Sequence, residues 1–84
     1  HLECLATLIP ENTNQYDNQA IRIDIKGMTV GYFSRNDARR FRMRLITKRL
    51  MGQTTTCNAI IEGGQLLHDG NRSNYSLSLA IDRF

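Results

Sequence analysis

Apolar and polar residues alternate with a period of two in several segments of the chain, which predicts strands with one buried and one exposed face. The clearest case is residues 19–25, where three isoleucines occupy alternate positions and Arg22 and Asp24 lie between them. Apolar or β-branched patterns predict four more strands, at residues 2–9, 28–33, 53–62 and 74–82. Turn-forming residues separate these strands: Pro10, residues 11–18, Lys26-Gly27, Gly63-Gly64 and a hairpin loop at residues 65–73.

The apolar spacing changes to that of a helix after the third predicted strand. Ser34 and Asp37 form a Ser-x-x-Asp pattern similar to a capping box, so a helix is expected over residues 35–50. Gly52 is the expected C-terminal cap. Helical spacing directs Ala38, Phe41, Leu45 and, as a further candidate, Met51 toward the core, and it spreads Arg39, Arg40, Arg42, Arg44 and Lys48 over the opposite side.

This order of elements predicts a mainly β fold with one helix, of the α+β class. Three strands, the helix and two further strands follow one another in 84 residues, which is enough for a single small domain spanning residues 1–84. Short antiparallel connections favour a small curled sheet or incomplete β-barrel with the helix closing one end. Such a thin domain has little room for a deep catalytic pocket.

Positive charge is concentrated in the predicted helix. The chain carries 11 Lys and Arg residues against 8 Asp and Glu, a net charge of +3. Seven of the basic residues lie within residues 35–49, where Asp37 is the only acid, so this segment has a net charge of +6 and the remainder −3. One face should therefore be strongly positive, which favours a nucleic-acid partner, although a solvated helix face is the simpler alternative.

The loop at residues 11–18, ENTNQYDN, places a tyrosine and an aspartate side by side among amides and acids. The loop is followed by Ala20-Ile21 in the next predicted strand, and then by Val30-Gly31-Tyr32-Phe33. An Asn-x-Tyr-Asp turn, Ala-Ile and Val-Gly-aromatic at this spacing resemble the HIRAN domain, over nearly the whole chain from residue 3 onward. Two departures accompany the resemblance: Gln15 replaces the usual proline, and the family's first strand would precede the start of this chain.

The resemblance implies an OB-like module that binds single-stranded DNA and recognises a free 3′-hydroxyl end. It implies that Tyr16 stacks on a base and that Asp17 accepts a hydrogen bond from the terminal hydroxyl. Tyr32 would line the same groove, Arg35 would contact a phosphate, and Tyr75 would stack on a second base. The family occurs in Swi/Snf-type DNA-dependent ATPases acting at stalled replication forks, which implies a role in DNA repair.

Elementary chemistry agrees with these roles. Stacking of a base on an aromatic side chain contributes about 1–3 kcal/mol and tolerates any base. A carboxylate repels phosphates, so Asp17 suits the end of a strand, where a hydroxyl is present and a phosphate is absent. The helix arginines, Arg39 among them, would steer the backbone. The alternative is a structural corner, in which Asp17 bonds backbone amides of the turn and Tyr16 covers the edge of the core.

Other functional classes find little support in the residues. No Gly-rich phosphate loop or Ser-His-Asp arrangement points to an enzyme, and no cofactor is expected. A metal site is not expected, because the available ligands lack the close sequence pairs that such sites use: Cys4, Cys57, His1 and His68. Two reduced thiols are expected in preference to a disulfide, in a cytoplasmic protein or, in a eukaryote, a nuclear one. No apolar run is long enough to span a membrane. The rival hypothesis is a protein-interaction module that self-associates or docks through an open sheet edge, and a third is RNA binding in the same groove.

Overall fold

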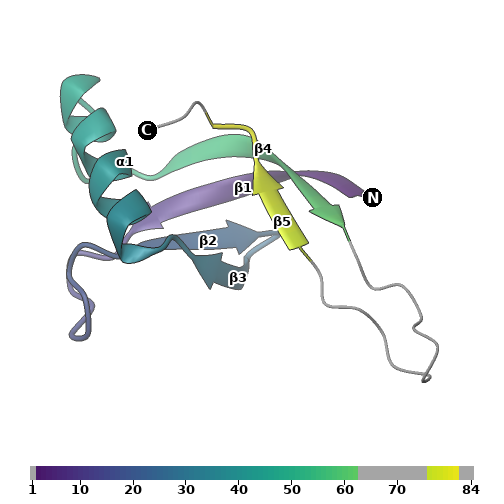
Figure 1. Ribbon diagram of the computed structural model, residues 1–84, viewed down its shortest axis with the longest axis horizontal. Coiled ribbons are helices and arrows are strands. Elements are labelled where there is room, and N and C mark those ends of the chain that lie inside the picture. The colour runs from purple at the N-terminus through teal and green to yellow at the C-terminus, as the bar shows by residue number, and fades with distance from the viewer. Residues whose placement is uncertain (1, 63–75, 82–84) are drawn as a thin grey trace.

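The computed structural model describes residues 2–62 and 76–81 and has the expected mainly β architecture with one helix (Figure 1). The elements are β1 (Leu2–Pro10), β2 (Ile21–Ile25), β3 (Met28–Tyr32), α1 (Arg35–Thr47), β4 (Thr55–Glu62) and β5 (Ser76–Leu79). Their order confirms the predicted sequence of three strands, a helix and two strands. The predicted hairpin loop at residues 65–73 and Tyr75 lie outside the described residues.

The strands form one antiparallel sheet in the order β3-β2-β1-β4-β5. β1 is the central strand and pairs with both β2 and β4, with Leu8 opposite Ile23 on one side and Thr55 on the other. The sheet curls into a half-barrel, and α1 crosses one end of it beside the loop that joins β1 to β2 (Figure 1). This arrangement is that of an OB-like α+β fold and confirms the predicted incomplete barrel.

The core lies between the concave face of the sheet and α1. Ala6, Leu8, Ile21, Ile23 and Ile25 fill the sheet side of it, as the alternation along β2 predicts. Ala38, Phe41 and Leu45 fill the helix side, as the helical spacing predicts. Phe33 packs edge-on against Phe41 with ring centroids 5.3 Å apart, which fixes the junction between β3 and α1 to the core.

The start of α1 agrees with the capping prediction, because the Ser34 hydroxyl accepts a hydrogen bond from the Asp37 N–H at 3.2 Å. The end of the helix does not agree. α1 stops at Thr47, and Arg49 at φ 59° takes the left-handed conformation directly after the helix; Gly52 also has a positive φ, of 74°, but lies in the turn that follows.

Two backbone hydrogen bonds explain this earlier end. The Leu50 N–H donates to the Leu45 carbonyl at 2.7 Å and the Arg49 N–H donates to the Ile46 carbonyl, which together make a Schellman motif. The motif turns Leu50 back against the core and leaves Met51 73% exposed. Met51 as a core residue and Gly52 as the helix cap were therefore wrong predictions.

The other boundaries differ little from expectation. β4 begins at Thr55, two residues later than predicted, and β5 covers residues 76–79 of the predicted 74–82. Lys26 and Gly27 both have positive φ, as a type I′ two-residue turn between β2 and β3 requires. In the part of the chain that the structure describes, no helix is both long and apolar enough to cross a membrane.

Candidate nucleic-acid interface

The loop between β1 and β2, residues 11–20, is closed at its base and ordered by its own polar groups. The Glu11 N–H donates to the Ala20 carbonyl at 2.9 Å, and the Ala20 N–H donates to the Asp17 carbonyl at 3.1 Å. Ala20 itself is buried and continues into β2. The loop is therefore a compact, defined structure at the edge of the core rather than an open connection.

Asn14 organises the tip of this loop. Its side-chain oxygen accepts hydrogen bonds from the Tyr16 N–H at 2.8 Å and the Asp17 N–H at 3.1 Å. Its amide nitrogen donates to Glu11 Oε1 at 3.0 Å. Asparagine suits this position because its short side chain can act as acceptor to the turn and donor to a neighbour at once. Asn14 thus sets the position of both Tyr16 and Asp17.

Tyr16 is 83% exposed. It therefore does not cover the edge of the core, as the structural alternative for this residue would require. A tyrosine held at its backbone by Asn14 and open on its ring offers a stacking surface at low entropic cost.

Asp17 has two different roles for its two carboxylate oxygens. Oδ1 accepts a hydrogen bond from the Gln19 N–H at 3.0 Å, which is the turn-stabilising bond of the structural alternative. Oδ2 lies 3.8 Å from Nε of Arg35, at the start of α1. The Asp17 side chain is 17% exposed and that of Arg35 is 72% exposed. This ion pair is therefore open enough for Arg35 to reach a second anion.

Tyr32 joins the loop through Glu11. It lies opposite Arg22 in the β2–β3 pairing, on the face of the sheet away from the core. A hydrogen bond to Glu11 raises the pKa of Tyr32, while the Asn14 hydrogen bond is the main cause that lowers the pKa of Glu11. One carboxylate, that of Glu11, thus connects Tyr32 to the residue that positions Tyr16.

The same face carries a further ion-pair network that supports Glu11. Arg22 donates to Glu11 Oε2 at 3.1 Å and to both oxygens of Asp24, at 3.0 and 3.2 Å. Thr29 donates to Asp24 at 2.9 Å. A hydrogen bond to Asp24 is the main cause that raises the pKa of Arg22. This network fixes the start of the loop to β2 and β3.

Arg42 does not lie on the exposed face of the helix, as its predicted position required. It is half-buried, and its guanidinium donates to the Gln19 carbonyl at 2.7 Å, the Ala20 carbonyl at 3.1 Å and Asn12 Oδ1 at 2.9 Å. Burial lowers the pKa of Arg42, and the nearby charge of Asp17 acts in the opposite direction. Arg42 is therefore a contact between α1 and the loop.

The structure thus gathers four of the six predicted site residues around this loop. Tyr16 and Asp17 lie at its tip, Arg35 contacts Asp17, and Tyr32 contacts Glu11 at its base. Arg39 is exposed one helical turn beyond Arg35. Tyr75 lies outside the described residues.

Sequence reasoning missed the residues that hold the loop together. Asn14 was considered only as part of a motif, although an asparagine two residues before the tyrosine is the usual signal of a turn closed by a hydrogen bond from the backbone to the asparagine side chain. Arg42 lies seven residues after Arg35 and therefore on the same side of the helix, which was the available signal for its contact with the loop. Glu11 and Arg22 are close only because β2 turns back beside the end of β1, which the local sequence does not show.

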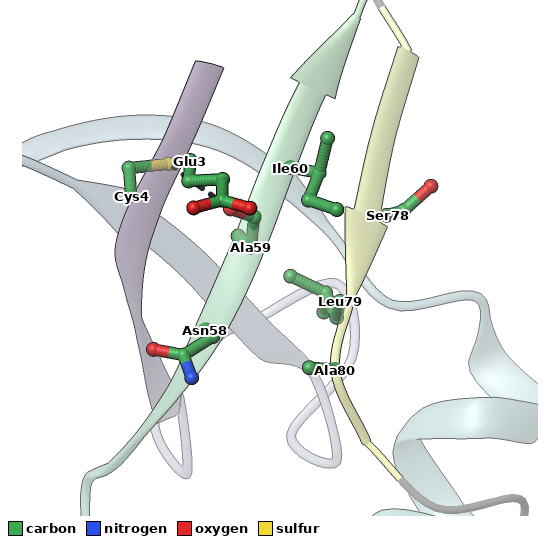
Figure 2. Close-up of a pocket in the computed structure, with 8 residues that line it drawn as sticks. All are labelled: Glu3, Cys4, Asn58, Ala59, Ile60, Ser78, Leu79 and Ala80. Carbon is green, nitrogen blue, oxygen red and sulfur yellow. Dashed lines mark hydrogen bonds between the residues drawn. The ribbon is translucent and has the colours of Figure 1, made fainter. Parts of the chain in front are cut away.

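Another depression lies elsewhere, between β1, β4 and β5 (Figure 2). It has a volume of about 500 Å³ and is lined by Glu3, Cys4, Asn58, Ala59, Ile60, Ser78, Leu79 and Ala80. Figure 2 shows Ile60 on β4 and Leu79 on β5 among the residues that line it. The described residues that line it include no Arg or Lys, so this depression is poorly suited to a phosphate backbone.

Cys4 and Cys57 are both free thiols. The Cys4 thiol is directed at the Ala59 carbonyl at 3.8 Å, and burial raises the pKa of Cys57. Among the described residues, no three His, Cys, Asp or Glu side chains gather as metal ligands would.

No family model, curated protein or solved structure matches the chain. The case for a function therefore depends on the geometry of the loop and on the charge of α1. The loop carries an exposed aromatic ring, that of Tyr16, next in sequence to a carboxylate, and α1 places the exposed Arg35 3.8 Å from that carboxylate.

Proposed function

We propose that this domain is a HIRAN-like module that binds single-stranded DNA and holds its 3′-hydroxyl end at the loop of residues 11–20. The observation that carries the proposal is the pairing of an 83% exposed Tyr16 with the Asp17–Arg35 contact beside it. An aromatic ring can stack on the base of a terminal nucleotide, a carboxylate can accept a hydrogen bond from its hydroxyl, and a guanidinium can donate hydrogen bonds to its phosphate.

Each residue has a distinct role in this proposal. Tyr16 stacks on the last base, and Oδ2 of Asp17 accepts a hydrogen bond from the terminal hydroxyl. Arg35 and Arg39, four residues apart on one side of α1, contact successive phosphates. Tyr32 lines the groove from β3, and Tyr75 provides a second stacking surface.

The position of Asp17 explains how a carboxylate can belong to a site for a polyanion. It lies 3.8 Å from Arg35, and its charge acts on the guanidinium of Arg42 as well. The positive charges of Arg35 and Arg42 therefore outnumber the negative charge of Asp17 at this place, which favours binding of an anion. Only the hydroxyl end of the strand comes close to the carboxylate itself. A strand with a phosphate in the place of the hydroxyl would bring two anions together.

Fluorescence anisotropy of a short labelled single strand tests the proposal. Tyr16→Ala should weaken binding by about 5- to 150-fold, the equivalent of one stacked base, without changing the salt dependence. Arg35→Gln and Arg39→Gln should each reduce the slope of log K against log [salt] by about 0.7.

Lys26→Gln is the matched control, because it removes one charge at the β2–β3 turn, at the far end of β2 from the loop. It should leave the slope unchanged. An RNA strand of the same sequence in the same assay separates DNA binding from RNA binding. Wild-type protein that binds neither strand at low salt contradicts the proposal.

The rival function is self-association or docking through an open sheet edge. β3 is an edge strand, and it exposes Met28 by 71% and Val30 by 48%. Sedimentation at several protein concentrations tests it: a dimer that forms with increasing concentration and is insensitive to salt favours this function over DNA binding. In either case we propose a non-catalytic domain without a cofactor, working in the cytoplasm or, in a eukaryote, in the nucleus; a DNA-repair role belongs to the DNA-binding alternative.

A further inference from the structure

Arg42 connects α1 to both ends of the loop that carries Tyr16 and Asp17. Its Nε donates to the Gln19 carbonyl at 2.7 Å and its Nη2 to the Ala20 carbonyl at 3.1 Å, where the loop returns to β2. Its Nη1 donates to the Asn12 side chain at 2.9 Å, where the loop leaves β1. One guanidinium therefore spans the loop from its first residues to its last.

Arginine is well suited to this task and few other residues are. The planar guanidinium directs several donors in fixed directions, so it can bond two adjacent carbonyls and a side chain at the same time. A lysine could satisfy at most part of this set from a flexible stem. The half-buried position of Arg42 also distinguishes it from the exposed Arg39 and Arg40 on the same helix.

We propose that Arg42 is a positioning residue for strand binding: it holds the loop of residues 11–20 against α1, so that Tyr16 and Asp17 face the strand beside Arg35. This inference rests on the proposed function, because it assigns Arg42 a role in that same site. Arg42 would act through the loop and not through a phosphate, since its three nitrogens are all engaged on loop atoms.

The loop contact can be tested without any DNA, by hydrogen exchange. Arg42→Gln should increase amide exchange in residues 11–20, while the amides of the β1–β2 ladder keep their protection. Arg40→Gln is the matched control: it removes the same charge from an exposed position two residues earlier, on the opposite side of the helix. Equal exchange of the loop in the two variants would overturn the proposal. If Arg42→Gln fails to fold, Arg42→Lys is the milder substitution, and it should likewise increase amide exchange in residues 11–20.

The effect on binding follows from the anisotropy assay. Arg42→Gln should weaken binding of the labelled strand by about 3- to 10-fold, the cost of ordering a loosened loop, with the salt slope unchanged. A slope reduced by about 0.7 would show a phosphate contact in place of a positioning role and would overturn the proposal.

A double-mutant cycle separates positioning from general stability. If Arg42 acts through the tip of the loop, Arg42→Gln should cost much less affinity in a Tyr16→Ala background than in the wild type. Full additivity would overturn the proposal. If loop exchange rises in Arg42→Gln but the wild-type protein binds no strand, the proposed function fails while the contact between α1 and the loop stands.

Discussion

Asn14→Ala is the substitution that most directly tests how the loop is built. It removes the oxygen that accepts from the Tyr16 and Asp17 N–H groups and the nitrogen that donates to Glu11. It leaves the backbone free to adopt the same turn. The decrease in the free energy of unfolding therefore measures what one side chain contributes to the conformation of the loop.

The expected cost can be worked out from the exposure of the three bonds. A net contribution of about 0.5–1.5 kcal/mol is typical for an intramolecular hydrogen bond. The bond to the Tyr16 N–H is exposed, so water replaces it, whereas the bonds to Asp17 and Glu11 are partly buried. Two effective bonds give a destabilisation of about 1–3 kcal/mol.

The destabilisation caused by Asn14→Ala should also depend on pH. The Asn14 bond is the main cause that lowers the pKa of Glu11 below 4.5 in the folded protein. A lowered carboxyl pKa contributes stability above the unfolded value, and that contribution is lost as the pH falls through the folded value. The difference between wild type and Asn14→Ala should therefore shrink below pH 4.5.

Urea unfolding followed by circular dichroism measures these quantities. Asn18→Ala is the matched control, because Asn18 is exposed in the same loop and its side chain accepts only a long 3.5 Å bond from Gln19. The free energy of unfolding of that control should lie within about 0.5 kcal/mol of the wild-type value. An Asn14→Ala variant as stable as the control would refute the reasoning.

Three further predictions concern the fold around the site. Leu8→Ala, at a residue 1% exposed in the centre of the core, should cost about 2–5 kcal/mol in chemical unfolding, and a loss below 1 kcal/mol would contradict the core described here. Arg49→Gly should be more stable than Arg49→Ala by about 1 kcal/mol, because both lose the charge but only alanine keeps a Cβ in the left-handed conformation; equal melting curves would argue against the Schellman motif. The pKa of Tyr32 should lie above the ordinary value of 10.0, and its bond to Glu11 should persist until the pH rises through that higher pKa; the difference in tyrosinate absorbance between wild type and Tyr32→Phe should titrate above 10.0, and a difference that titrates at or below 10.0 would contradict the bond.

Local patterns were sufficient to predict most of the fold. Alternation along residues 21–25 predicted which side of β2 is buried, and the Ser34–Asp37 pattern predicted the start of α1. The predicted end of α1 was wrong because the favoured glycine, Gly52, lies three residues after Arg49, the residue whose left-handed conformation ends the helix. Arg49 takes that conformation because the motif lets Leu50 pack on the core, and this contact between distant elements has no local signal.

The sequence pointed to residues that the structure brings close together, but not to the contacts that connect them. An exposed Tyr16 and a contact between Asp17 and Arg35 agree with a site that brings these residues together. Arg42 was assigned to the solvent face because helical spacing separates it from the core residues, and that assignment ignores a loop packed against the flank of the helix. Which of several arginines meets a carbonyl depends on how the loop folds back, and that is a property of the tertiary structure.

The most direct test of the proposed function compares two single strands that differ only at the 3′ end, one with a hydroxyl and one with a phosphate. The proposal predicts that the wild-type protein prefers the hydroxyl strand and that Asp17→Ala removes the preference while keeping salt-sensitive binding. Equal binding of the two strands by the wild type would contradict end recognition and leave only a basic surface on α1.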